Sequence, residues 1–142
     1  MTKTIILDSS VVAKWFFPEE GNENALLFKE KFTRNEISLA APVLLYYEMN
    51  NILRTAVNTY RVNIAEATKV FEAFLHLNFV VYSTEYLMKK TLQEALEYNI
   101  SSYDASYVAL SQYLHAPFIT ADKKLLRKVN SPLIADLEKF VL

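Results

Sequence analysis

The stretch Thr4-Ile5-Ile6-Leu7-Asp8-Ser9-Ser10-Val11-Val12 decides the fold that we expect for this chain. Three β-prone apolar residues run directly into Asp8, and a short apolar run bounded by a polar turn is typical of a strand buried on both faces. Two hydroxyl residues follow, and Ser9 or Ser10 can cap a helix that starts at Val11. Asp8 therefore lies where a strand's carboxyl end meets a helix start, which is where open α/β sheets bind ligands.

Strand-like and helix-like segments alternate along the rest of the chain. Apolar runs predict further strands at 37–41, 79–82, 117–119 and 132–135. Helical spacing of apolar residues, or a capping residue, predicts helices at 11–17, 25–32, 43–60, 63–77, 84–98, 101–114, 121–129 and 136–141, with Thr84 and either Ser101 or Ser102 as caps. This alternation favours an α/β fold, a three-layer sandwich of a five-stranded parallel sheet with helices on both faces.

The organisation of the chain is that of one domain. Pro18 is expected to end the first helix, and a polar loop is expected at 19–24. Because the chain has no internal repeat, no low-complexity segment and no linker rich in glycine, serine or proline, residues 1–142 are expected to form a single domain.

The composition excludes several classes of function. A net charge of −1 is not that of a protein that coats nucleic acid, and the single glycine, Gly21, leaves no glycine-rich phosphate loop. Cysteine is absent, which excludes disulfides and thiol chemistry, and His76 and His115 lack zinc-ligand spacing. We recognise neither a signal peptide nor an apolar run of about 18 residues, so we expect a cytoplasmic protein without membrane contact.

Four acids occupy positions that differ from solvated helix faces. Asp8 and Asp122 each follow a predicted strand, and Asp104 lies in the first turn of a predicted helix. Glu48 lies at the edge of the apolar stripe of its long helix, where a buried acid requires a partner. The remaining aspartate, Asp136, is expected to cap the last helix.

Each of these acids also has a purely structural explanation. Asp104 completes the capping-box spacing Ser101-x-x-Asp104, Asp8 and Asp122 suit helix N-termini, and Glu48 can lean outward. In a doubly wound sheet, however, strand ends and helix starts share one edge, so the four carboxylates would converge there and repel one another. A divalent cation relieves such repulsion, and oxygen-rich sites suit Mg²⁺ or Mn²⁺.

With these residues in view, the chain resembles the PIN-domain ribonucleases, and among them the small VapC-like toxins of toxin–antitoxin pairs. The resemblance rests on four motifs in order: Ile6-Leu7-Asp8-Ser9-Ser10-Val11, Glu48 early in a long helix after a proline, Tyr103-Asp104-Ala105-Ser106-Tyr107-Val108-Ala109-Leu110, and Ile119-Thr120-Ala121-Asp122-Lys123-Lys124-Leu125. Order and spacing match over essentially the whole length.

The resemblance implies a metal-dependent endoribonuclease that hydrolyses RNA phosphodiester bonds. It carries the catalytic, metal-binding acids onto Asp8, Glu48, Asp104 and Asp122, with Mg²⁺ or Mn²⁺ as the cofactor, and the hydroxyl groups near the metal onto Ser10 and Thr120. One or two such ions can activate a water molecule and stabilise the leaving oxygen, and the two hydroxyls would orient the carboxylates. No residue pattern offers a covalent route, so direct hydrolysis is expected, leaving a 5′-phosphate by family analogy.

RNA and protein partners are also expected. Lys14, Lys123, Lys124 and Arg127 lie near the acids in the sequence and can contact phosphates, although a solvated helix face explains them equally well. The resemblance further implies a cognate antitoxin protein that covers the active-site groove, and a homodimer.

Three other interpretations compete with the nuclease. A catalytically silent PIN fold would be a binding module. A receiver-like phosphoacceptor domain is also a parallel sheet with an acidic pocket, but it needs an aspartate at the end of a middle strand, and the run 79–82 ends without one. A phosphatase of the haloacid-dehalogenase type needs Asp-x-Asp, where this chain has Ser10 at the third position.

Overall fold

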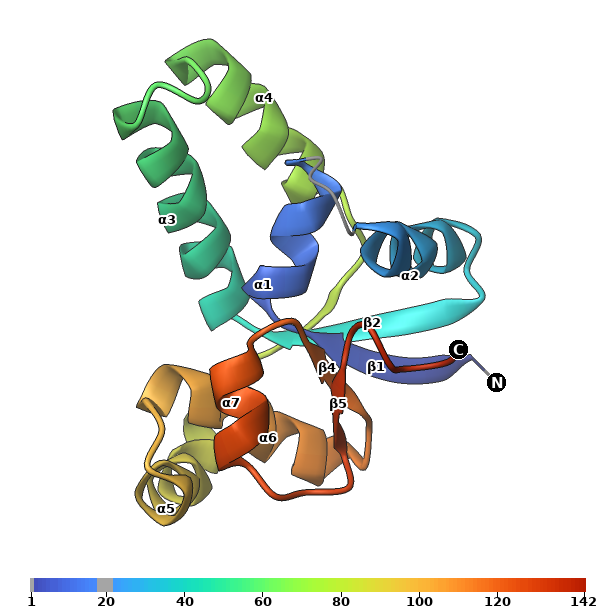
Figure 1. Cartoon of the computed structure of the whole chain (residues 1–142), viewed down its shortest axis with the longest axis vertical. Helices are drawn as coiled ribbons and strands as arrows, with labels where there is room; N and C mark the ends of the chain where they lie inside the picture. The colour runs from blue at the N-terminus through green and yellow to red at the C-terminus, as the bar shows by residue number, and fades with distance from the viewer. Residues whose placement is uncertain (1, 18–21) are drawn as a thin grey trace.

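A computed structural model describes residues 2–17 and 22–142, and Figure 1 shows a central sheet with helices on both sides. Five parallel strands pair in the order β3-β2-β1-β4-β5. They are β1 (Lys3–Leu7), β2 (Ile37–Pro42), β3 (Val80–Tyr82), β4 (Phe118–Thr120) and β5 (Ile134–Asp136). The predicted parallel sheet and fold class are confirmed. The predicted stop at Pro18 and the first half of the predicted loop at 19–24 lie outside the described residues, and the second half of that loop is wrong, because α2 begins at Glu23.

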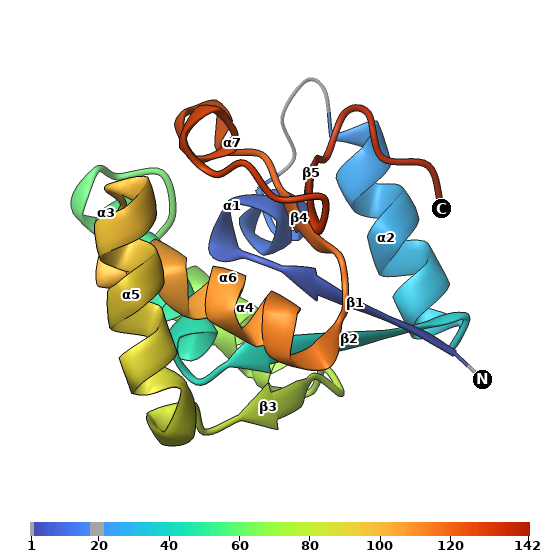
Figure 2. The ribbon, with the colours of Figure 1, turned by 90° about the horizontal axis from the view of Figure 1, so that it is seen from below.

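The helices form two layers. They are α1 (Ser9–Val12), α2 (Glu23–Thr33), α3 (Leu44–Asn58), α4 (Ile64–Leu75), α5 (Met88–Tyr98), α6 (Ser102–Leu114) and α7 (Lys123–Lys128), with short 3-10 helices η1 (Ala13–Trp15) and η2 (Glu85–Leu87). Helices α1 to α4 lie on one side of the sheet and α5 to α7 on the other, and α3 and α4 form a hairpin that extends beyond the sheet (Figure 1). Figure 2 shows α6 lying across the sheet beside α5.

Strand β1 is the centre of the core. Ile5, Ile6 and Leu7 are fully buried, as expected for a strand covered on both faces. The chain leaves β1 toward β2 and β3 on one side and returns to β4 and β5 on the other, so the strand order reverses between β1 and β4. Since ligands bind outside the carboxyl ends of strands at such a reversal, the ends of β1 and β4 mark the expected crevice.

Two predicted N-caps are wrong, whereas the structural explanation of Asp8 as a residue at a helix N-terminus is confirmed. The first helix begins at Ser9, and its cap is Asp8, whose carboxylate accepts a hydrogen bond from the Ser10 backbone N–H at 3.1 Å. The acid, being a stronger acceptor than a hydroxyl, takes that position, and the helix tightens to η1 instead of continuing to residue 17. Thr84 makes no side-chain capping bond; η2 follows it, and α5 begins at Met88.

The predicted helix at 136–141 is also wrong. Asp136 ends strand β5, and residues 137–139 form a turn. The Asp136 carboxylate accepts from the Glu138 backbone N–H at 3.0 Å and from the Lys123 ammonium at 2.6 Å. These bonds stabilise a single turn directly after the strand, in place of the predicted helix. Within the described residues, no helix is both long and apolar enough to cross a bilayer.

Candidate functional site

Asp8 is held at the crevice by hydroxyl groups from two segments. It is only 7% exposed. The Thr120 hydroxyl, at the end of β4, donates to Asp8 Oδ2 at 2.6 Å, and the Ser10 hydroxyl donates to Asp8 Oδ1. The pairing of Leu7 with Ile119 sets the register that brings the ends of these two strands together. Both oxygens of the carboxylate are therefore fixed in position.

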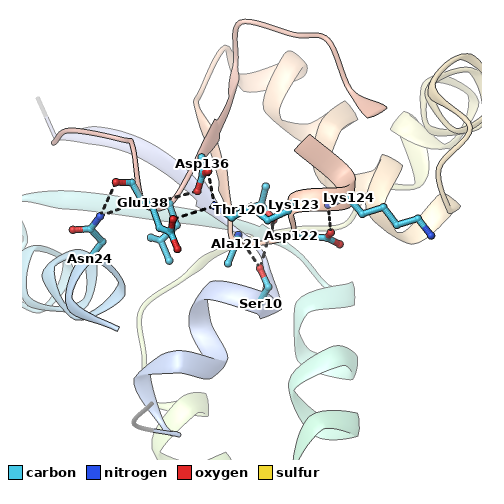
Figure 3. A network of polar contacts seen from close by, with 10 residues as sticks. Ser10, Asn24, Thr120, Ala121, Asp122, Lys123, Lys124, Asp136 and Glu138 are labelled. Carbon is cyan, nitrogen blue, oxygen red and sulfur yellow. Dashed lines mark hydrogen bonds and ion pairs between the residues drawn. The ribbon is translucent and has the colours of Figure 1, made fainter. Parts of the chain in front are cut away.

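The same hydroxyl groups also position the chain that leads to Asp122. The Ser10 hydroxyl oxygen accepts from the Ala121 backbone N–H at 3.1 Å, and the Thr120 hydroxyl oxygen accepts from the Asp122 N–H at 3.0 Å (Figure 3). Asp122 caps α7, accepting from the N–H groups of Lys124 and Leu125. Its structural explanation therefore holds, and it lies at the same edge as Asp8.

Thr120 should prove essential for the stability of this network. The change Thr120→Val removes a fully buried hydroxyl and leaves Asp8 Oδ2 without its donor, so we expect the free energy of unfolding near pH 7 to fall by about 1–3 kcal/mol. Urea denaturation measures the loss, and Thr120→Ser is the matched control, because it keeps the hydroxyl. Equal stability of the valine and wild-type proteins would show that the bond contributes nothing.

Glu48 reaches the site from α3 and is half-buried. Its Oε1 accepts from the Tyr107 hydroxyl at 2.6 Å, and the Tyr107 ring stacks on Phe118 of β4 with centroids 5.4 Å apart. The Ser9 side chain also hydrogen-bonds to Glu48. The predicted partner for an acid at the edge of the apolar stripe is thus a tyrosine from the core.

Tyr107 was missed among the candidate residues. It lies three residues after Asp104 in α6, so the two side chains lie on one helix face, and that spacing was the available signal. Burial raises the pKa of the Tyr107 hydroxyl well above its usual value, and the nearby Glu48 raises it further. Tyr107 is therefore a permanent donor at neutral pH.

The carboxylates interact as a row of neighbours. Burial raises the pKa of Asp8 to about 6, hydrogen bonds from Ser10 and Thr120 oppose the rise, and repulsion by Glu48 adds to it. Burial also raises the pKa of Glu48, with repulsion by Asp104 adding to the rise. The pKa of Asp104 is raised by burial and by its neighbour Asp122. The four predicted acids thus lie along one edge, each electrostatically coupled to the next.

The row of four carboxylates does not form a closed metal-binding site. Across residues 2–17 and 22–142, no three acidic or histidine side chains are near enough to one another to hold a metal ion as they stand. The donor set nevertheless fits a hard divalent cation, because it consists of carboxylate oxygens whose pKa values are raised in part by their mutual repulsion. Glu48, Asp104 and Asp122 are all partly exposed, so their side chains have room to turn.

The predicted cations differ in their surroundings. Lys123 is ion-paired with Asp136 and Glu138, at 2.6 and 3.3 Å, on the far side of α7 from Lys124 (Figure 3). Lys14 lines a small pocket of about 80 Å³ beside that ion pair. Lys124 lines a separate pocket with Asp104 and Asp122, and Arg127 is exposed in the last turn of α7.

The chain is similar to known proteins over most of its length. The PIN domain family matches residues 5–131. The chain is 27% identical over 126 residues to a protein of Pyrobaculum aerophilum named Ribonuclease VapC3, an alignment that covers 87% of this chain and 93% of the relative.

Two solved structures share the fold. A crystal structure of a Pyrobaculum aerophilum protein superposes with a TM-score of 0.73 and 24% identity, covering 96% of this chain and 85% of the other. A toxin–antitoxin complex from Klebsiella pneumoniae contains a chain that superposes with a TM-score of 0.67 and 14% identity, covering 94% and 97%.

Proposed function

This chain belongs to the PIN domain family, and we propose that it is a metal-dependent endoribonuclease that hydrolyses RNA phosphodiester bonds. The relative named Ribonuclease VapC3 supports this class of activity. The observation that carries the proposal is the Asp8 carboxylate, which lies buried at the strand-order reversal with both oxygens fixed and with Glu48 as its charged neighbour. A buried acid with a raised pKa at such a place is typical of a catalytic centre.

Asp8, Glu48, Asp104 and Asp122 would hold Mg²⁺ or Mn²⁺. A bound divalent cation supplies activation of water near neutral pH and stabilisation of charge on the leaving oxygen. Asp8 is the central ligand of this proposal, because it ends the central strand and its geometry is the most constrained. Ser10 and Thr120 hold its two oxygens, which limits the rotation of the carboxylate.

Glu48 has the second role in the proposal. The Tyr107 hydroxyl donates to one of its oxygens at 2.6 Å and so fixes the carboxylate, which would orient an attacking water molecule and accept its proton. Burial raises the pKa of Glu48, and a carboxylate with a raised pKa is the better proton acceptor. Tyr107 acts through Glu48 and is a positioning residue.

We further propose that the nuclease is the toxin of a toxin–antitoxin pair. The Klebsiella pneumoniae structure that shares the fold is a toxin–antitoxin complex, and a protein antitoxin that covers the carboxylate edge would restrain cleavage. A second copy of the chain is the other expected partner, and Met88, Leu92 and Leu96 form an exposed apolar row along α5 for it to cover. The RNA substrate of the proposed nuclease is expected in the cytoplasm. Residues 1–142 are taken as one domain.

Cleavage of RNA in the presence of a divalent cation tests the function. We expect purified protein to cleave single-stranded RNA with Mg²⁺ or Mn²⁺, to lose activity in EDTA, and to recover it when the cation returns, because the bound cation would lower the pKa of the attacking water and stabilise charge on the leaving oxygen. Gel analysis of end-labelled RNAs measures the products. Salt-sensitive binding of RNA without cleavage of any RNA under Mn²⁺ would contradict the nuclease and favour a binding module.

A further inference from the structure

A pocket of about 220 Å³ opens beside the two outer acids of the row. One wall is the turn between α5 and α6, and the other is α7. The residues that matter in it are Asn99, Ser101, Asp104, Asp122, Lys124 and Lys128. Its volume is about seven times the roughly 30 Å³ that a water molecule occupies in the liquid, so it admits a larger polar group.

Hydrogen bonding ties the two walls together. The Lys128 ammonium on α7 donates to the Asn99 carbonyl oxygen at 2.9 Å. Asn99 ends α5 in the left-handed conformation, with φ of 53°, which asparagine tolerates better than most residues. An ammonium group has three donors, so Lys128 is held in place with donors to spare.

Lys124 completes the positive side of the pocket. Over the described ranges, 2–17 and 22–142, no carboxylate is ion-paired with its ammonium, whereas the adjacent Lys123 is ion-paired with Asp136 and Glu138. Figure 3 shows Lys123 reaching toward Asp136 while Lys124 extends in the opposite direction, past Asp122. Two consecutive lysines of the same helix therefore have different roles, one structural and one available for a ligand.

We infer that this pocket binds an RNA phosphate next to the one that is cleaved, with Lys124 and Lys128 as its donors. The inference rests on the proposed function. It also predicts the path of the bound RNA, which would run from the Asp8 centre across Asp122 toward the turn between α5 and α6. The chain has a net charge of −1 and a row of four acids, so RNA needs a local cationic contact to approach this edge. Lys124 and Lys128 supply it beside the acids.

Binding of RNA by lysine variants tests the pocket directly. In an Asp8→Asn background, which should bind without cleaving, fluorescence anisotropy with a short labelled single-stranded RNA measures affinity between 50 and 200 mM salt. We expect Lys124→Ala and Lys128→Ala each to weaken binding about 5-fold near 0.1 M salt and to lower the slope of log K against log salt by about 0.7. The double variant should lower the slope by about 1.4.

Matched controls separate this pocket from general charge. Lys123→Ala removes the same charge from the neighbouring position, and Lys69→Ala removes an exposed charge from α4; both should leave the slope unchanged. Thermal melting checks that each variant folds, and Lys128→Arg should restore binding if loss of the Asn99 bond disturbs the turn. The inference is overturned if the double variant matches Lys69→Ala, or if Lys123→Ala weakens binding as much as Lys124→Ala does.

Failure of the pocket and failure of the nuclease give different results. If the wild-type protein cleaves RNA and the Lys124→Ala/Lys128→Ala variant, made with Asp8 intact, keeps the wild-type KM, the pocket is refuted and the nuclease stands. If the lysine variants lose salt-dependent binding while the wild-type protein cleaves no RNA with either cation, the pocket is supported and the proposed activity fails.

Discussion

Asp8→Asn is expected to lower RNA cleavage by roughly 10³-fold or more, because it removes the negative charge of the central ligand for the cation. Stabilisation by a bound cation contributes several kcal/mol to such a reaction, and each 1.36 kcal/mol corresponds to a factor of ten in rate. Cleavage of a labelled RNA under saturating Mn²⁺ measures the loss.

The substitution should preserve the fold, which makes the loss of activity interpretable. The asparagine carbonyl can accept from the Ser10 backbone N–H and hydroxyl, as Asp8 Oδ1 does. The amide nitrogen would donate to the Thr120 hydroxyl oxygen, which has a lone pair for it. Glu30→Gln on α2 is the control, since it neutralises an exposed acid away from the row. Cleavage by Asp8→Asn at the wild-type rate would remove Asp8 from the centre of the mechanism.

The stability of the metal-free protein should fall as the pH rises from about 4 to about 6. Burial raises the pKa of Asp8 from 3.8 to about 6, so the folded protein keeps a proton that the unfolded chain releases. A group whose pKa is raised on folding stabilises the protein fully below its unfolded pKa and loses this contribution as the pH passes its folded pKa. At 1.36 kcal/mol per pKa unit, the loss is about 3 kcal/mol.

Comparison with Asp8→Asn isolates this contribution from other titrating groups. Lys123 lowers the pKa of Asp136, so that carboxylate stabilises the protein at higher pH and opposes the trend of Asp8. We therefore expect the difference in unfolding free energy between Asp8→Asn and wild type, measured by urea denaturation in EDTA, to increase in favour of the variant between pH 4 and pH 7. Parallel curves for the two proteins would show that Asp8 titrates normally.

Local sequence features predicted much of the framework and the candidate acids. The run from Ile5 to Leu7 predicted a strand buried on both faces, and β1 is that strand. Ser101 was one of two predicted caps for α6, and its side chain accepts from the Asp104 backbone N–H. Predictions failed where the local sequence was compatible with two capping residues or with two kinds of secondary structure. Asp8 rather than a serine caps α1, and Asp136 ends a strand instead of opening a helix.

The alternation of strands and helices and the placement of acids after buried strands follow from neighbouring residues and from periodicity, so they can be predicted from the amino-acid sequence alone. The side chains that hold those acids cannot, because they come from distant parts of the chain. The Thr120 hydroxyl reaches Asp8 across 112 positions, and Tyr107 reaches Glu48 across 59. The difference between Lys123, which is ion-paired, and Lys124, which lines a pocket, is likewise a tertiary property. Contacts of this kind depend on strand order, register and competition between partners in space, and the spacing of residues along a chain does not encode those distances.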